Sequence, residues 1–330
     1  MKKHIFLFVL VLLMISITAC SGSNLENYVA AIEKTNSMVK GSDSMEMSIV
    51  TKYNTVGLEE DVQKLIQSFE QSKFTMTGSF DNDLKKSRKI GYLNYGNLGF
   101  DFNIYGVDDA YYIEPFFLEL KDHRYIEFSL DEFKVPESEI PSEFFQEIGK
   151  KWNEIISEEN VMRGEKVLVT TDDGEIKSRE FTITLNEEQL KEFILYIIEL
   201  FEENGEYLNI MDQVTYIETD VELTEEDKEN LYRDLFTGLK DFIDKSDDLN
   251  LFYKAYIDID GYVVQEDIEF NMGNEAGKAG ELINLSFSMV TKYWDIEKEQ
   301  DLDFDITSFD NSIRFDKLNL EELMPYREVK

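Results

Sequence analysis

The runs "KIGYLNYG" (Lys89–Gly96) and "LGFDFNIYG" (Leu98–Gly106) decide the fold class of this chain. Both are rich in aromatic residues, which favour β-strands, and each ends in a glycine where a turn is expected. Two further runs, "DAYYIEPFF" (Asp109–Phe117) and "RYIEFSL" (Arg124–Leu130), continue the pattern. Because the four runs follow one another through short connections, they predict an antiparallel meander.

Strands and helices are also predicted on both sides of this meander. Ser23 and Glu26 form a capping-box pattern at the start of the first helix. The other predicted helices cover 58–69, 141–157, 186–204 and 224–245, and the other predicted strands cover 44–53, 73–81, 281–299 and 301–307, with hairpins about Asp173–Gly174 and Asp260–Gly261. Since strands run consecutively and helices come in separate blocks, the pattern predicts an α+β fold with an antiparallel sheet.

The N-terminus has the layout of a secretory signal peptide. Lys2 and Lys3 precede an apolar run from Ile5 to Ile15, and small or polar residues follow. The apolar run is shorter than the roughly 20 residues that a transmembrane helix needs. We therefore expect residues 1–19 to be a lipoprotein signal peptide and residues 20–330 to be a single α+β domain, with a subdivision near residue 160 as the alternative.

The signal peptide ends in Ile17-Thr18-Ala19-Cys20, and Cys20 is the only cysteine of the chain. This stretch resembles a bacterial lipobox, with Ile17 where leucine is usual. The resemblance implies cleavage before Cys20 and diacylglycerol on its sulfur, so that the protein is lipid-anchored on the outer face of the cell membrane. The alternative is a free thiol in an ordinary secreted protein.

The composition is strongly acidic and also rich in aromatic residues. The chain has 33 Lys and Arg against 69 Asp and Glu, which gives a net charge of −36. This charge argues against nucleic acids and anionic lipid head groups as partners. Hydrophobic residues make up 42% and aromatic residues 13%, so a globular fold is expected rather than disorder.

No motif in the sequence points to catalysis or to a cofactor. Beyond the signal peptide the only histidine is His123, interpreted as a surface or turn residue, and the common nucleophile and phosphate-loop motifs are absent. Asp258–Gly261 has the wrong register for an EF-hand loop. Asp301, Asp303 and Asp305 alternate in a predicted strand and are interpreted as one solvated face. We expect no enzyme activity, no cofactor and no metal site, although loose calcium binding by these acidic runs and a carboxylate-only enzyme stay open.

The aromatic residues of the meander are the candidate ligand surface. Their ordinary role is to pack the sheet on helices, and their functional role would be to line an open apolar face. They are Tyr92, Tyr95, Phe100, Phe102, Tyr105, Tyr111, Tyr112, Phe116 and Phe117.

The lipobox, the first helix, the long first strand and the aromatic sheet together resemble the LolA and LppX type of half-barrel lipoproteins. The resemblance implies a curved antiparallel sheet packed against several helices, with a cavity for acyl chains. It assigns no ligand residue, because no motif of the family is matched. It predicts a non-enzymatic lipoprotein that binds a lipid or another apolar ligand. Two alternatives are an interaction protein without a ligand and a solute-binding lipoprotein of an importer.

Overall fold

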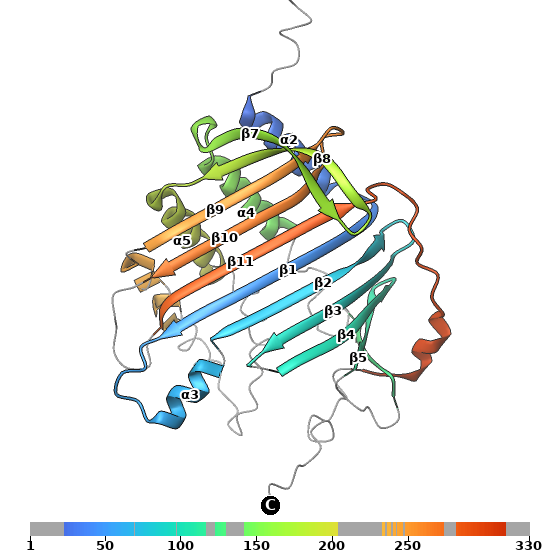
Figure 1. Cartoon of the computed structure of the whole chain (residues 1–330), viewed down its shortest axis with the longest axis horizontal. Coiled ribbons are helices and arrows are strands. Elements are labelled where there is room, and N and C mark those ends of the chain that lie inside the picture. Colours follow the sequence, from blue (N-terminus) through green and yellow to red (C-terminus); the bar gives the residue numbers. More distant parts are fainter. Residues whose placement is uncertain are drawn as a thin grey trace, which may run out of the picture.

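The computed structural model describes residues 23–116 apart from 69 and 97, 123–129, 142–203, most of 233–246, 248–273 and 282–314. Twelve strands form one curved, unclosed sheet in the order β12-β6-β5-β4-β3-β2-β1-β11-β10-β9-β8-β7 (Figure 1). All neighbours pair antiparallel except β12 and β6. The strands are β1 Lys40–Tyr53, β2 Gln71–Asp81, β3 Lys86–Tyr95, β4 Leu98–Val107, β5 Ala110–Pro115, β6 Tyr125–Ser129, β7 Val161–Thr171, β8 Gly174–Thr184, β9 Asp248–Asp258, β10 Val263–Gly273, β11 Leu282–Trp294 and β12 Ser312–Arg314.

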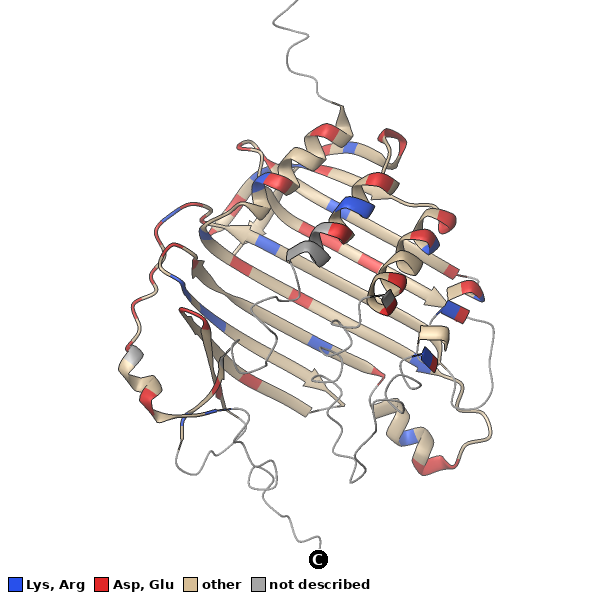
Figure 2. Cartoon of the chain, turned by 180° about the vertical axis from the view of Figure 1, so that it is seen from behind, with Lys and Arg blue, Asp and Glu red and all other residues tan. Residues whose placement is uncertain are grey.

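Helices lie mainly over one part of this sheet. They are α2 Asn24–Asn36, α3 Glu60–Ser68, α4 Ser142–Ile155 and α5 Glu187–Glu203, with the short 3-10 helices η1 Glu158–Asn160 and η2 Ile306–Asn311 and further helical residues between 233 and 244. Seen from behind, α2, α4 and α5 cover the β7–β11 half of the sheet (Figure 2). The predicted α+β class with a curved antiparallel sheet packed against helices is therefore confirmed.

The two halves of the sheet meet where β1 pairs with β11. The pairing runs from Ser42 opposite Trp294 to Lys52 opposite Asn284, so it joins residues more than 200 positions apart. Strands β1–β6 continue the sheet on one side of this seam and β11–β7 on the other. The described strands therefore form one continuous sheet, although the chain returns to it near residue 160 at the opposite edge.

One face of the sheet, called the inner face below, carries an unbroken row of apolar residues. Directly opposed residues in a sheet share a face, so the strand pairing identifies the row. From β7 to β4 it consists of Val161, Ile183, Tyr253, Ile268, Met289, Met47, Phe74, Leu93 and Phe100. This row of the inner face is thus apolar across nine strands, and a covering layer along it would remove its side chains from water.

The helices bury only part of this row. Tyr28 of α2, Ile155 of α4 and Leu190 of α5 belong to one core cluster with Val161 and Ile183, and all five are at most 8% exposed. Met47, Phe74, Leu93 and Phe100, farther along the row, are not among the buried core residues. Over β1–β4 the inner face is therefore less covered by the described helices than over β7–β11.

The outer face carries a second, smaller cluster, which corrects one prediction. Residues 301–305 form no strand: the segment continues into η2, and the Asp305 side chain accepts a hydrogen bond from the Thr307 backbone N–H. Phe309 of η2 stacks on Tyr112 with ring centroids 4.2 Å apart. The period-two pattern of "DLDFDIT" was misleading because Phe304 and Phe309 pack against the outer face of the sheet instead of extending it.

Most local predictions are confirmed, and α3 differs in one respect. Ser23 and Glu26 form the expected capping box, and the Asn186 side chain accepts from the Gln189 N–H at the start of α5. The hairpins about Asp173–Gly174 and Asp260–Gly261 both form. Helix α3 is amphipathic but has no buried residue, so its apolar side packs into no core among the described residues. The predicted helix over 224–245 lies mostly outside the described residues.

Candidate functional site

An apolar cavity of about 340 Å³ lies on the inner face at the β3–β6 end of the sheet. Its size falls within the roughly 300–1,000 Å³ typical of small-molecule sites. The lining residues come from four neighbouring strands and are all apolar: Leu93, Phe100, Phe102, Ile113, Pro115, Ile126 and Phe128. The cavity therefore offers no hydrogen-bond partner from its side chains and suits a hydrocarbon group.

Gly91 on β3 makes room for one wall of this cavity. It lies opposite Phe102, and a methyl group at Gly91 would come within 2.3 Å of the Phe102 ring. The ring extends over β3 toward Phe74 of β2, with centroids 6.2 Å apart. The missing side chain at Gly91 thus lets the Phe102 ring come close to the β3 backbone.

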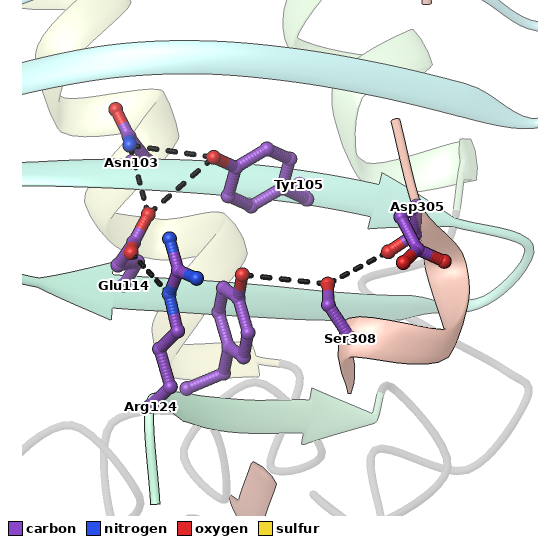
Figure 3. A network of polar contacts seen from close by, with 7 residues as sticks. Asn103, Tyr105, Glu114, Arg124, Asp305 and Ser308 are labelled. Carbon is purple, nitrogen blue, oxygen red and sulfur yellow. Dashed lines mark hydrogen bonds and ion pairs between the residues drawn. The ribbon is translucent and has the colours of Figure 1, made fainter. Parts of the chain in front are cut away.

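A polar network on the outer face holds the strands that line the cavity (Figure 3). Glu114 of β5 accepts hydrogen bonds from Asn103 at 3.0 Å, from Tyr105 at 3.4 Å and from Arg124 at 2.6 Å. Farther along, the Tyr125 and Ser308 hydroxyls lie 3.4 Å apart. Successive residues of a strand point to opposite faces, so Asn103, Glu114 and Tyr125 alternate with the cavity residues Phe102, Ile113, Pro115 and Ile126. The network therefore fixes the position of β4, β5 and β6 from behind the cavity.

The charge state of Glu114 depends on this network. Burial alone would raise the pKa of the Glu114 carboxyl, but the hydrogen bonds from Asn103, Arg124 and Tyr105 and the Arg124 charge outweigh it. The pKa consequently lies below the ordinary value of 4.5. Glu114 is only 8% exposed, so its interactions are partly shielded from solvent.

We predict a pH-dependent contribution of Glu114 to stability. Because its pKa is lower in the folded chain than in the unfolded chain, the ionised group stabilises the fold at neutral pH. This contribution is lost as the pH falls from about 5 through the folded-state pKa. Glu114→Gln should therefore lower the free energy of unfolding at pH 7 and flatten its decline toward acid, as measured by urea unfolding at several pH values. Asp101→Asn, exposed on the outer face of β4, is the control and should keep the wild-type pH profile; a wild-type profile for Glu114→Gln would contradict the assignment.

A second group of polar side chains lies on the inner face, in another row of directly opposed residues that leads to the cavity. Asp43 of β1 and Lys89 of β3 form an ion pair of 2.7 Å, and their side chains are only 11% and 23% exposed. The pair spans β2 over Gly78, which lies opposite both residues. A methyl group at Gly78 would lie 2.1 Å from the Arg88 carbonyl oxygen, so only glycine fits there.

Further polar side chains follow on the same face toward the helices. Burial, Glu266 and Asp43 raise the pKa of the Tyr293 phenol, so it stays a neutral hydrogen-bond donor. Burial also raises the pKa of Glu266, which accepts a hydrogen bond from the Tyr253 hydroxyl. Burial raises the pKa of Tyr28 to about 12, and its hydroxyl accepts from the Trp152 indole at 3.3 Å. Polar groups thus run from the helical layer toward the Asp43–Lys89 pair.

The nine aromatic residues predicted as a ligand surface separate onto the two faces. Phe100 and Phe102 line the cavity. Tyr105 and Tyr112 belong to the outer cluster around Phe309. By strand alternation Tyr92 also lies on the outer face, whereas Tyr95 and Tyr111 lie on the inner face and are 49% and 41% exposed. Phe116 is 61% exposed just after β5, and Phe117 lies outside the described residues.

Sequence reasoning missed the aliphatic half of the lining and the Asp43–Lys89 pair. Strand alternation could have grouped Leu93 with Phe100 and Phe102. Asp43 escaped notice because the predicted strand began at Ser44, whereas β1 begins at Lys40. Asp43 lies two positions before Met45 and therefore on the same strand face, so a charged residue on an otherwise apolar face could have indicated this polar site.

The remaining candidates do not converge on a site. His123 precedes β6, and Asp258 accepts from the Tyr262 N–H inside the β9–β10 turn. Asp301, Asp303 and Asp305 do not share a strand face, because no strand forms there. Within the described ranges no three His, Cys, Asp or Glu side chains are grouped for a metal ion. Cys20 lies outside the described residues, and none of the described helices has the length and apolar character to cross a membrane.

Comparison with known proteins adds little to this description. No protein-family model and no curated protein sequence matches the chain. Among solved structures it is similar to the crystal structure of a beta-barrel-like protein of domain of unknown function DUF1849 from Brucella abortus. That match has 9% identity and a TM-score of 0.15, and it covers 80% of this chain and 99% of the other. The fold assignment therefore rests on the strand pairing of the chain itself.

Proposed function

We propose that the protein is a non-enzymatic, lipid-anchored lipoprotein on the outer face of the cell membrane that holds a hydrocarbon chain in its inner-face cavity. The observation that supports the ligand-binding part of this proposal is the wholly apolar lining of that cavity. Each methylene group that leaves water for such a site contributes about 0.8 kcal/mol. A lipid acyl chain, from the membrane to which Cys20 would attach the protein, is the occupant that this lining suits.

The two alternatives make different demands on the structure. An interaction protein without a ligand would have no use for a cavity walled by four strands. An importer's solute-binding protein usually has two lobes of parallel strands joined by helices, whereas among the described strands only β12 and β6 pair parallel. The acyl-chain proposal accounts best for the cavity and its lining.

The proposal predicts that a polar residue in the cavity wall weakens lipid binding. Leu93→Gln places an amide against the hydrocarbon, where it finds no hydrogen-bond partner among the lining side chains, so affinity should fall by about tenfold or more. Native mass spectrometry of the full chain, titrated with a fatty acid and with a monoacylglycerol of equal chain length, measures this.

The matched control is Ile90→Gln on the same strand. Ile90 lies on the outer face of β3, opposite Asn103, and is 53% exposed. The Ile90→Gln substitution should leave lipid binding and the melting temperature unchanged. If the wild-type chain bound neither probe, the acyl-chain proposal would be wrong. If the wild-type chain and a folded Leu93→Gln chain bound the probes equally well, the cavity would not be the binding site of the acyl chain.

A further inference from the structure

The Asp43–Lys89 ion pair has unused hydrogen-bonding capacity on the inner face. Lys89 donates to Asp43 Oδ2, but Asp43 Oδ1 is buried without a hydrogen-bond partner among the described residues. Asp43 as a whole is 8% exposed. A buried carboxylate oxygen without a donor is costly, so such an atom points to a missing partner.

Two donors lie near this acceptor. The Lys89 ammonium has three N–H groups, of which Asp43 takes one. Tyr293, opposite Asp43 on β11, is close enough for Asp43 to influence its pKa, yet its hydroxyl makes no hydrogen bond within the described part of the chain. Asp43, Lys89 and Tyr293, called the inner polar site below, therefore present an acceptor and donors together.

The inner polar site lies on the same face as the cavity and in line with it. The strand pairing runs from Asp43 through Gly78 to Lys89, then through Ile104 to Ile113 and Ile126. The last two residues line the cavity. Two strand spacings of about 4.8 Å separate Lys89 from Ile113, so a molecule with its head at Lys89 reaches the cavity over roughly 10 Å.

The charges of the site select among head groups. Lys89 and Asp43 neutralise each other, so a charged head group would be buried there without a counter-charge. A carboxylate or phosphate would also lie near the acidic residues Asp43 and Glu266. An ammonium that bound the free Asp43 Oδ1 would lie beside the Lys89 ammonium and be repelled by it. A hydroxyl or amide both donates and accepts hydrogen bonds and brings no charge.

We infer that the ligand of the cavity is an uncharged amphiphile, whose hydroxyl- or amide-bearing head binds Asp43, Lys89 and Tyr293 and whose acyl chain extends into the Leu93–Phe102 cavity. This inference rests on the proposed function, because it names the class of ligand for the same site. It excludes free fatty acids and anionic phospholipids as preferred ligands.

The test is a competition between two probes that differ only in the head group. The full chain is mixed with equal amounts of monododecanoylglycerol and dodecanoate, and native mass spectrometry measures the ratio of the two adducts. The wild-type chain should favour the acylglycerol by about tenfold. Asp43→Asn leaves the Lys89 charge uncompensated, so the preference should shift toward dodecanoate by at least about tenfold.

A matched control uses an ion pair that joins β1 to the neighbouring strand β2. Glu46 and Lys73 form an ion pair of 2.7 Å, and both side chains are more exposed, at 59% and 44%. Glu46 points to the outer face by strand alternation, so Glu46→Gln should keep the wild-type ratio. Because Asp43→Asn could unfold the chain, a double variant, Asp43→Asn with Lys89→Gln, is included. It keeps the site neutral and should still favour the acylglycerol.

The outcomes separate this inference from the proposed function. Binding of both probes with equal strength, unchanged by a folded Asp43→Asn, would overturn the head-group assignment and leave the acyl-chain cavity standing. Binding of neither probe would overturn both. A preference for the acylglycerol that Asp43→Asn reverses and Glu46→Gln leaves alone supports the inner polar site.

Discussion

Gly78→Ala is expected to destabilise the protein by about 3 kcal/mol, at the upper end of what overpacking usually costs. A methyl group at this position would lie 2.1 Å from the Arg88 carbonyl oxygen, 2.7 Å from the Lys89 Cα and 2.8 Å from the Lys89 Cγ. The first two atoms belong to the backbone of the paired strand and cannot rotate away. Strands β2 and β3 would have to separate, and the Asp43–Lys89 pair above them would be lost. Urea unfolding followed by circular dichroism measures the change.

Gly149→Ala is the matched control for this substitution. Gly149 lies within α4, and a methyl group there would meet nothing within 4 Å. Glycine inside a helix costs about 0.5–1 kcal/mol relative to alanine, so this variant should be more stable by that amount. If Gly78→Ala were as stable as the wild-type chain, β2 and β3 could separate at little cost. The prediction that only glycine fits between them would then be wrong.

Cys20→Ser is expected to abolish lipid attachment and signal-peptide removal together. If the lipobox is used, the diacylglycerol is carried on the Cys20 sulfur and cleavage occurs between Ala19 and Cys20. Two acyl chains anchor a protein stably, whereas one gives only marginal binding, so the anchor would account for the membrane association of the mature chain. Labelling cells with radioactive palmitate and measuring the intact mass of the purified chain test both steps.

The Cys20→Ser chain should carry no label and should retain residues 1–19. Fractionation alone would be ambiguous, because an uncleaved apolar segment from Ile5 to Ile15 could still hold the chain at the membrane. Ser21→Ala is the control and should be labelled and processed like the wild-type chain. Incorporation of palmitate by Cys20→Ser would contradict the lipobox assignment.

Local structure could be predicted closely from the sequence, because short-range chemistry dictates it. The Ser23 capping box, the Asn186 cap and the two Asp-Gly hairpins depend on neighbours within a few residues. The exception is the segment 301–307, where alternation suggested a strand. Its Phe304 and the following Phe309 instead pack on Tyr105 and Tyr112, and contacts across some 200 positions overrode the local pattern.

The candidate site could be predicted only in part. Of the nine aromatic residues that were predicted as a ligand surface, Phe100 and Phe102 line the cavity. The phenylalanines and tyrosines looked equivalent in the sequence, yet Tyr105 and Tyr112 lie on the outer face beneath Phe309. Which face of a strand is covered depends on the distant segments that pack against it. The order of apolar residues along the chain does not show which segments these are.

The α+β class, most strand and helix positions and the acidic net charge follow from the amino-acid sequence, because period, capping residues and charge are local properties of the chain. Long-range packing decided that β1 pairs with β11 and that one apolar row crosses nine strands. It also decided that Asp43 meets Lys89 above Gly78. These contacts join residues up to about 250 positions apart, and their existence depends on sheet register and on the space left by a missing side chain.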